Sequence, residues 1–328
     1  MTSTTKKGLP GFLASAAVAV VVMLAVLAGL SAVFYPKDNR EDCGAYEQRA
    51  LGVLGEPDDS IDVIVIGDSE AYSAFSPLQM WGQQGFTSYV CATHAQELCY
   101  GNTILHRATQ NQHPKVVVIE TNALFRRFSI SAAMMRCMED AVPILEYHDR
   151  WKSLTPDDLT LDYESTYTDL TKGFIVRRGI EAAGNVDYMD VDEVQGPSPR
   201  IPRLNLLYLH SMLDYCREIG AEPVFVSMPS TVNWNPARHD VVQSLADEVG
   251  VRYIDLNVGE TRVDIDWEND TRDAGDHMNI SGAKKVSTYL GSWLAEEFDL
   301  PDHRGNEAYA SWDELLEWYE GRVGPATE

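Results

Sequence analysis

Ser69 and His277 are the two residues of this sequence whose types could together perform nucleophilic catalysis. Ser69 lies in VIVIGDSEAYSAF, directly after the apolar run Val63–Ile66 and a single glycine, Gly67. A serine hydroxyl needs a base to become a nucleophile, and His277, one of eight histidines, occupies a similar polar loop, DAGDHMNISGAKK. The alternative is that the polar residues around Ser69 only satisfy the backbone of a turn.

Two acids close to His277 could orient its ring. Asp276 is its neighbour in the chain, and Asp273 lies four residues before it. A carboxylate in this role fixes the tautomer of the histidine and stabilises the imidazolium that forms during catalysis. Neighbouring side chains often point apart, so Asp276 needs a turned backbone to reach the ring, and Asp273 is the alternative.

Asn122 is the third candidate site residue. It follows the apolar run of VVVIETNALF. An amide there could donate a hydrogen bond to a developing oxyanion, together with backbone N–H groups near Ser69, and one such donor contributes about 3–4 kcal/mol in a known acyl-transfer enzyme. Alternatively, Asn122 caps a helix that begins at Ala123.

Short apolar strands alternate with helices over most of the chain, which predicts an α/β fold with a parallel sheet covered on both faces. In such sheets, ligands bind beyond the carboxyl ends of the strands, where Ser69 and Asn122 are expected. The expected strands are Ile61–Ile66, Thr87–Ala92, Lys115–Ile119, Pro223–Ser227 and Val251–Asp255. The expected helices are Ala45–Leu54, Ser76–Gln84, Ala95–Gln112, Pro202–Ile219, Ala237–Val249 and Ser281–Phe298, the last with Ser281 as its N-cap.

The pattern also predicts the order of domains. We expect a short tail at 1–10, a transmembrane anchor at 11–34, a linker at 35–60, the α/β domain at 61–300 and a helical tail at 301–328. An insertion at about 129–200 interrupts the α/β pattern, either as a lid or substrate platform over the strand ends or as a peripheral helical subdomain. The tail helix Trp312–Tyr319 is expected to pack back on the domain.

The apolar segment at 11–34 is long enough to cross a bilayer. Its 24 residues carry no charge, and about 20 suffice for a transmembrane helix. A cleaved signal peptide is the alternative, but its apolar region is usually only about 7–15 residues long. We therefore expect a single-pass protein of the cell membrane with its main domain extracytoplasmic.

Charge and cysteine content exclude several classes of function. A formal net charge of −24 repels phosphates, so no nucleic-acid partner is expected. The five cysteines show no metal-ligand spacing, and no phosphate-binding loop or G-x-S-x-G elbow is present, so no metal or cofactor is predicted. In an extracytoplasmic domain, Cys91 and Cys99 are the nearest candidates for a disulfide, whereas Cys216 is expected to be a buried apolar residue.

Three short motifs resemble the blocks of the SGNH/GDSL hydrolase superfamily. IGDSE is similar to the first block and supplies Ser69, ETN resembles the third and supplies Asn122, and DHMN is similar to the last and supplies His277. The resemblance implies a flavodoxin-like three-layer α/β/α domain and a serine acyl-ester hydrolase or acyltransferase. The sequence departs from the family pattern in having no second-block glycine after the second strand, and Ala274 where the orienting aspartate usually lies.

Within that superfamily, the apolar amino terminus and the last block look most similar to an envelope branch that acts in D-alanylation of teichoic acids or O-acetylation of exopolysaccharides. This resemblance implies an acylated glycan or envelope polymer as substrate and a membrane-bound O-acyltransferase as partner. The alternative is a catalytically degenerate SGNH scaffold that binds carbohydrate or assists an envelope acyltransferase complex.

Overall fold

The structure is a computed structural model that describes residues 9–190 and 198–323. The chain divides into two compact units. One unit contains the residues up to Tyr46 together with Ser131–Ser165, and the other contains Glu47–Ile130 and the residues from Thr166 onward. The second unit holds the sheet and every candidate site residue.

The second unit is built on a five-stranded parallel sheet with the strand order β2-β1-β3-β4-β5. This is the order of flavodoxin-like doubly wound sheets, so the predicted fold class is confirmed. Every residue of β1, β2 and β3 is buried, as expected for strands covered on both faces. The strands are β1 (Val63–Gly67), β2 (Ser88–Ala92), β3 (Val116–Glu120), β4 (Glu222–Ser227) and β5 (Arg252–Asp255).

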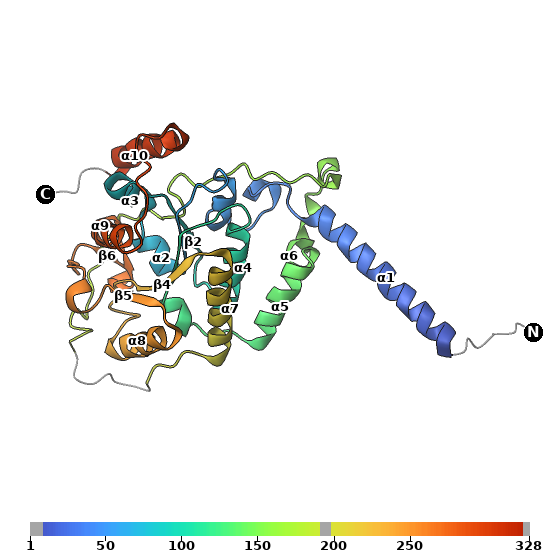
Figure 1. Cartoon of the computed structure of the whole chain (residues 1–328), viewed down its shortest axis with the longest axis horizontal. Coiled ribbons are helices and arrows are strands. Elements are labelled where there is room, and N and C mark those ends of the chain that lie inside the picture. Colours follow the sequence, from blue (N-terminus) through green and yellow to red (C-terminus); the bar gives the residue numbers. More distant parts are fainter. Residues whose placement is uncertain (1–8, 191–197, 324–328) are drawn as a thin grey trace, which may run out of the picture. The chain divides into compact units, whose positions relative to one another are not determined.

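Helices cover both faces of this sheet (Figure 1). On one face α2 and α3 both pack against α9, and α10 packs on α3. On the other face α4 packs against α7, while α8 packs on the edge strand β5. The bounds of these helices are α2 (Ser69–Ala74), α3 (Pro77–Gln84), α4 (Leu98–Ala108), α7 (Arg203–Ile219), α8 (Pro236–Val249), α9 (Ile280–Glu297) and α10 (Ala310–Val323). A two-stranded antiparallel ribbon, β6 (Thr271–Arg272) and β7 (His277–Met278), precedes α9.

The sheet places two candidate site segments side by side. β1 pairs with β3 in parallel, with Val63 opposite Val116, so their carboxyl ends meet at the same edge. The strand order reverses between β1 and β3, and ligands of doubly wound sheets bind at such a switch point. The residues that follow these two strands, including Ser69 and Asn122, therefore share the expected binding edge.

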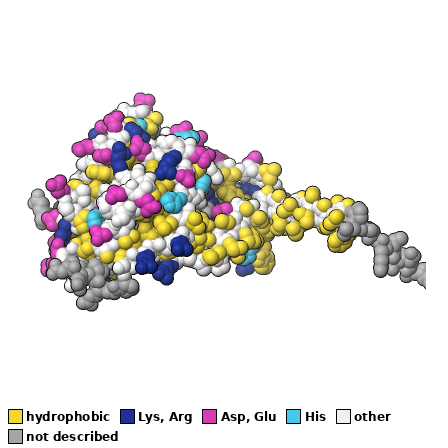
Figure 2. All heavy atoms as spheres, turned by 60° about the horizontal axis from the view of Figure 1, so that its bottom comes forward, with side chains coloured by type: hydrophobic (Ala, Val, Ile, Leu, Met, Phe, Trp, Pro, Cys, Tyr) yellow, Lys and Arg dark blue, Asp and Glu magenta, His cyan; other side chains and the backbone are white. Residues whose placement is uncertain are grey.

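The other unit contains α1 (Leu9–Phe34), α5 (Ile130–Ala141, from its second residue), α6 (Ile144–Tyr147) and the short helices η4 (His148–Lys152) and η5 (Pro156–Leu159). The end of α1 is held by Arg150, whose guanidinium donates to Phe34 O at 2.6 Å and to Asp158 Oδ1 at 2.6 Å. Within α1, Gly11–Phe34 forms one helix long and apolar enough to cross a membrane, and its side chains make a continuous hydrophobic surface in Figure 2.

The tail prediction is confirmed, because α10 covers the predicted helix Trp312–Tyr319 and packs on α3. The Trp81 indole of α3 donates to Asp313 Oδ1 at 3.0 Å, and its ring lies 5.4 Å from that of Trp312. Both indoles are buried.

Three expectations about helices were wrong. The N-cap of α9 is Asn279, whose side chain accepts from the Ser281 and Gly282 amides, and not Ser281. α4 begins at Leu98 and not at Ala95, because Ala95 has a left-handed backbone (φ 50°). The helix expected at Ala45–Leu54 is instead a 3-10 helix, η2 (Ala50–Gly55).

The expected disulfide was also wrong. Cys91, buried in β2, and Cys99, buried in α4, are not joined by a disulfide. Burial raises the pKa of the Cys99 thiol to about 11, so this group is a protonated thiol at neutral pH. Cys216 is fully buried in α7, as predicted.

Candidate active site

Ser69 is the first residue of α2, immediately after the carboxyl end of β1. Gly67 allows β1 to lie close to β3 at this point. Any other residue would clash, because a Cβ there would come within 2.6 Å of the Cβ of Glu120 on β3. Asp68 is the N-cap of α2, and its carboxylate accepts from the Glu70 amide at 3.0 Å. The turn therefore fixes the Ser69 backbone. Because Ser69 is in the first turn of α2, its backbone N–H has no acceptor within the helix.

His277 begins β7, and its ring is oriented by Asp273. The Nδ1 atom lies 2.9 Å from Asp273 Oδ2 and 3.6 Å from Asp276 Oδ2. Only the Asp273 distance is that of a hydrogen bond. With Nδ1 facing a carboxylate, the ring carries its proton there when neutral, which leaves Nε2 as the basic nitrogen.

An unusual loop brings Asp273 to the ring. Asp273, Ala274 and Gly275 all have left-handed backbones, with φ of 59°, 54° and 94°. Non-glycine residues occupy this region at a cost of roughly 1–2 kcal/mol each, so such runs persist only where surrounding contacts hold them. The Thr231 amide supplies one such contact, donating to Gly275 O at 3.0 Å. Asp273 thereby contacts His277 from four residues away, although Ala274 occupies the family's usual aspartate position.

Asp276 has a different partner. Its Oδ1 accepts from the Asn233 amide at 2.5 Å, and the same amide nitrogen donates to Glu70 Oε1 at 2.7 Å. Asn233 thus joins the loop that carries His277 to α2, the helix that follows β1. Asp273 therefore orients the His277 ring, whereas Asp276 connects the loop to α2 through Asn233.

The elements that carry Ser69 and His277 are in contact, since α2 packs against β7. The Arg272 guanidinium, next to this loop, donates to Ser73 Oγ on α2 at 3.0 Å. Among the hydrogen bonds of the described residues, none joins Ser69 to His277. Burial raises the pKa of Tyr72, and the nearby Ser69 hydroxyl partly offsets that rise. Catalytic hydrogen bonds of unliganded enzymes often form fully only with substrate.

Asn122 does not cap a helix, contrary to the alternative considered from its sequence. It is the first residue of the 3-10 helix η3 (Asn122–Phe125), whose N-cap is Thr121. Its amide nitrogen donates to Asp68 Oδ2 at 3.1 Å, and its amide oxygen accepts from Arg238 Nη1 at 2.9 Å. These contacts orient the amide beside the residue that precedes Ser69.

The loop after β2, where the family has a glycine, is organised by a side chain. The Thr93 amide donates to Gln96 Oε1 at 2.9 Å, and both residues are buried. This N–H is therefore occupied in the structure. A second-block oxyanion donor at this amide would require Gln96 to move.

Three carboxyl groups are buried under the site. Asp68, Glu70 and Glu120 are at most 2 % exposed. Burial, followed by the neighbouring acid charges, raises the pKa of Glu70 and of Glu120 well above the ordinary glutamate value. Each glutamate also keeps one carboxyl oxygen, Oε2, without a hydrogen-bond partner within the described part of the chain, which favours the protonated form.

Two arginines face this acidic cluster. Arg126 forms a salt bridge with Asp68 at 2.9 Å. Arg238, from α8, donates to Asn233 O at 2.5 Å as well as to Asn122, and lies 4.5 Å over the ring of Phe125. Burial lowers the pKa of Arg238, while the charges of the three buried acids oppose that change. The guanidinium therefore compensates buried negative charge directly beside the candidate oxyanion donor.

The sequence predicted Ser69, Asn122, His277 and both aspartates as site residues but did not predict this buried acidic cluster and its arginines. Glu70 and Glu120 carried a signal, because each is an acid at or just beyond the end of a buried apolar strand. No sequence pattern pointed to Arg238 or Asn233, because each lies more than a hundred residues from the buried acids Asp68, Glu70 and Glu120. Among the residues that the structure describes, no group of three or more His, Cys, Asp or Glu could hold a metal ion.

The raised pKa values of Glu70 and Glu120 predict a pH-dependent stability. Above the unfolded value of about 4.5, the folded chain holds protons that the unfolded chain has released. The free energy of unfolding should therefore fall as pH rises from 4.5 toward the raised folded pKa values. Glu70→Gln removes one of these groups and keeps the acceptor for Asn233, so its free energy of unfolding should fall less steeply. Urea unfolding between about pH 5 and 8 measures both slopes.

The exposed Glu218 on α7 offers the control. Glu218→Gln should leave the slope of the wild-type protein unchanged. Equal slopes for Glu70→Gln and the wild type would contradict a raised pKa at Glu70.

Comparisons with known proteins found distant structural similarity only. A putative acylhydrolase from Bacteroides fragilis aligns with TM-score 0.39 and 10 % identity over 76 % of this chain and 93 % of its own. A putative lipolytic protein of the G-D-S-L family from Desulfitobacterium hafniense aligns with TM-score 0.37 and 11 % identity over 70 % and 97 %. The lipase/acylhydrolase from Enterococcus faecalis aligns with TM-score 0.37 and 10 % identity over 72 % and 96 %.

These similarities, all with TM-scores below 0.5, neither assign the chain to a family nor transfer an activity to it. No protein-family model matches the sequence, and no curated protein matches it. Any function must therefore be argued from the geometry of the site.

Proposed function

We propose that this chain is an SGNH-type serine acyl-ester hydrolase or O-acyltransferase. The observation that carries the proposal is the placement of Ser69 at the β1/β3 switch point, on a helix that packs against the strand of an Asp273-oriented His277. A nucleophile, a base and an orienting carboxylate on adjoining elements are the parts that acyl transfer requires.

The first half-reaction forms an acyl-enzyme. The Ser69 hydroxyl turns toward His277, and its oxygen attacks the ester carbonyl carbon while Nε2 of His277 accepts the proton. Asp273, 2.9 Å from Nδ1, stabilises the resulting imidazolium. The imidazolium then protonates the departing alkoxide, and the acyl group remains on Ser69.

Two donors are in place for the tetrahedral oxyanion. One is the Ser69 backbone N–H at the start of α2. The other is the Asn122 amide, which carries two N–H groups, one of which is held by Asp68. A fixed donor stabilises the transition state because it need not reorient as charge develops.

The second half-reaction releases the acyl group to water or to a hydroxyl. In either case Nε2 of His277 takes the proton from the incoming oxygen as that oxygen attacks the acyl carbon, and returns it to the Ser69 oxygen as the ester bond to Ser69 breaks. Transfer to a glycan hydroxyl requires that water be excluded and that the acceptor be held.

The proposed setting is the cell membrane, with α1 as a single-pass anchor and the catalytic unit extracytoplasmic. The support is the apolar length of Gly11–Phe34 and its hydrophobic surface in Figure 2. The resemblance of the three motifs to the envelope branch supports an acylated glycan or teichoic-acid-like polymer as substrate and a membrane-bound O-acyltransferase as partner. The net charge of −24 disfavours nucleic acid.

A second candidate function is a non-catalytic SGNH scaffold that binds carbohydrate or assists an acyltransferase complex. The occupation of the Thr93 amide by Gln96 favours it, because this amide is then not available to an oxyanion. Such a scaffold would contain no activated serine, so reactivity separates the two functions.

The test is covalent labelling of the full-length protein, in detergent micelles, with a fluorophosphonate. Wild-type protein should be labelled, and Ser69→Ala should not be, because only an activated serine reacts rapidly. Ser211→Ala, at an exposed serine of α7, is the matched control and should be labelled like the wild type. Folded wild-type protein that stays unlabelled would exclude the catalytic proposal in favour of the scaffold.

A further inference from the structure

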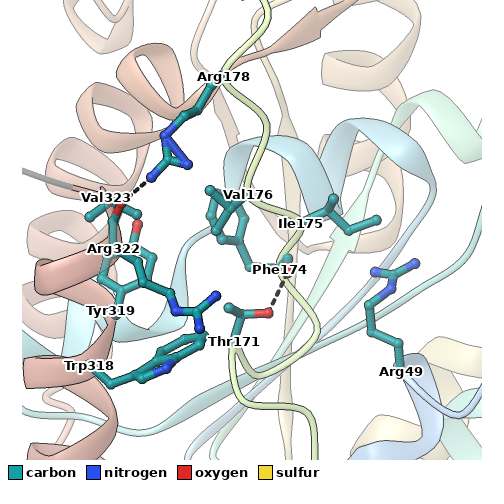
Figure 3. Close-up of a pocket in the computed structure, with 10 residues that line it drawn as sticks. All are labelled: Arg49, Thr171, Phe174, Ile175, Val176, Arg178, Trp318, Tyr319, Arg322 and Val323. Atoms are coloured by element: carbon teal, nitrogen blue, oxygen red, sulfur yellow. Dashed lines mark hydrogen bonds between the residues drawn. The ribbon is translucent and has the colours of Figure 1, made fainter.

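A cavity of about 420 Å³ lies in the sheet-containing unit, and its lining holds none of the residues of the proposed chemistry (Figure 3). We call it the arginine pocket. It is formed by the segment 171–178, by the carboxyl-terminal end of α10 and by Arg49. Its volume lies within the range of about 300–1,000 Å³ that small-molecule sites occupy.

Three arginines surround this cavity. Arg322 belongs to the last turn of α10. In Figure 3 the Arg178 side chain extends toward the backbone of Arg322, whereas the Arg322 guanidinium lies over Trp318 and Arg49 lies on the opposite side of the cavity from α10. Arg49 donates to Gly173 O at 2.7 Å, and Arg178 donates to the backbone oxygen of Arg322. Two guanidiniums also stack on aromatic rings: Arg49 lies 4.6 Å from the ring of Tyr72 and Arg322 lies 4.7 Å from that of Trp318.

None of these three arginines forms a salt bridge with an acid of the described residues, 9–190 and 198–323. This is notable in a chain with 50 acids and 26 basic residues, where other arginines, such as Arg126, Arg150 and Arg252, pair with carboxylates. Three like charges around one cavity repel one another, and an anion placed among them relieves that repulsion.

The remaining wall of the cavity is apolar. Phe174 is buried, Ile175 and Val176 are partly buried, and Trp318 faces the cavity beneath Arg322. An apolar wall with a few convergent charged donors is the usual composition of a ligand site. This combination of guanidiniums and apolar side chains suits a ligand with an anionic head and an apolar body.

The pocket is held in shape by backbone contacts. Lys172 O accepts from the Val90 amide of β2 at 2.9 Å, and the Ile175 amide donates to Tyr72 O of α2 at 2.8 Å. Gly173 has a left-handed backbone (φ 86°), and a Cβ there would come within 2.0 Å of Val90 O. A wall fixed in this way loses little conformational entropy when a ligand binds.

We propose that the arginine pocket binds an amphiphilic anion, namely a carboxylate or phosphate head on a short aliphatic or aromatic body. The guanidiniums of Arg178 and Arg322 receive the head through charge-assisted hydrogen bonds, and Phe174 and Trp318 receive the body. The pocket adjoins α2 through Tyr72, yet its lining contains none of Ser69, His277 or Asp273. The inference therefore stands independently of the proposed catalysis.

The test is calorimetric titration of the full-length protein in phosphatidylcholine nanodiscs, with empty nanodiscs as the blank. The probes are hexyl phosphate, hexanoate and the uncharged 1-hexanol. We expect the anions to bind and hexanol to bind at least about tenfold more weakly, because only a charged head uses the guanidiniums. The stronger of the two anions identifies whether the natural head is a phosphate or a carboxylate.

The double variant Arg178→Gln/Arg322→Gln should weaken anion binding about tenfold and leave hexanol binding unchanged. Arg217→Gln, at an exposed arginine of α7 that pairs with Asp214, is the matched control and should bind like the wild type. Ser69→Ala should also bind normally, so failure here is separable from failure of the catalytic proposal. No anion binding by the wild type, equal binding of hexanol, or full binding by the double variant would each overturn the inference.

Discussion

Replacing His277 by alanine should lower kcat/KM for p-nitrophenyl acetate by about 10³-fold, within the range expected for loss of a general base. The reason is that Nε2 of His277 is the proton acceptor for Ser69, while Nδ1 is held by Asp273 at 2.9 Å. Initial rates of ester hydrolysis by the full-length protein measure the effect. Ser69→Ala should lose as much, and the double variant should lose no more, because residues that act as one unit are not additive.

The two aspartates near His277 provide an internal comparison. Asp273→Asn should reduce kcat/KM by about 10²-fold, since the asparagine cannot stabilise the imidazolium as a carboxylate does. Asp276→Asn should have a much smaller effect on the rate, because Asp276 lies 3.6 Å from Nδ1 and is engaged by Asn233. If Asp276→Asn lost the larger share of activity, the assignment of the orienting role to Asp273 would be wrong.

Replacing Arg238 by methionine should lower the free energy of unfolding by about 3 kcal/mol, the size expected when one partner of a buried charge cluster is removed. Arg238 is the guanidinium that compensates Asp68, Glu70 and Glu120, and methionine keeps much of its apolar stem over Phe125 without the charge. Urea unfolding followed by tryptophan fluorescence measures the change.

The loss should shrink at acidic pH. Glu70 and Glu120, whose pKa values are raised by burial, need no countercharge once they are protonated. Arg217→Met, at an exposed and locally paired position, should change the free energy of unfolding by no more than about 0.5 kcal/mol. A loss at Arg238 that was the same at every pH would show that packing, and not charge, explains its effect.

The sequence by itself determined the fold class and the places of Ser69 and Asn122 beyond the carboxyl ends of two strands. Both follow from the order of apolar and polar residues over a few neighbouring positions of the chain. Continuous apolar runs such as Val116–Ile119 define buried parallel strands, and the carboxyl ends of such strands share one edge. A polar residue directly after such a run is therefore placed without knowledge of the rest of the chain.

Only the tertiary structure decided which acid orients His277 and what surrounds Ser69. Asp273 reaches the ring through three consecutive left-handed residues, a conformation that tertiary contacts impose and that residue types alone do not signal. Arg238 joins the cluster from α8, and the arginine pocket combines Arg49, the segment 171–178 and the end of α10. Such contacts join residues more than a hundred positions apart, so they depend on how helices pack on the sheet and leave no periodic pattern in the sequence.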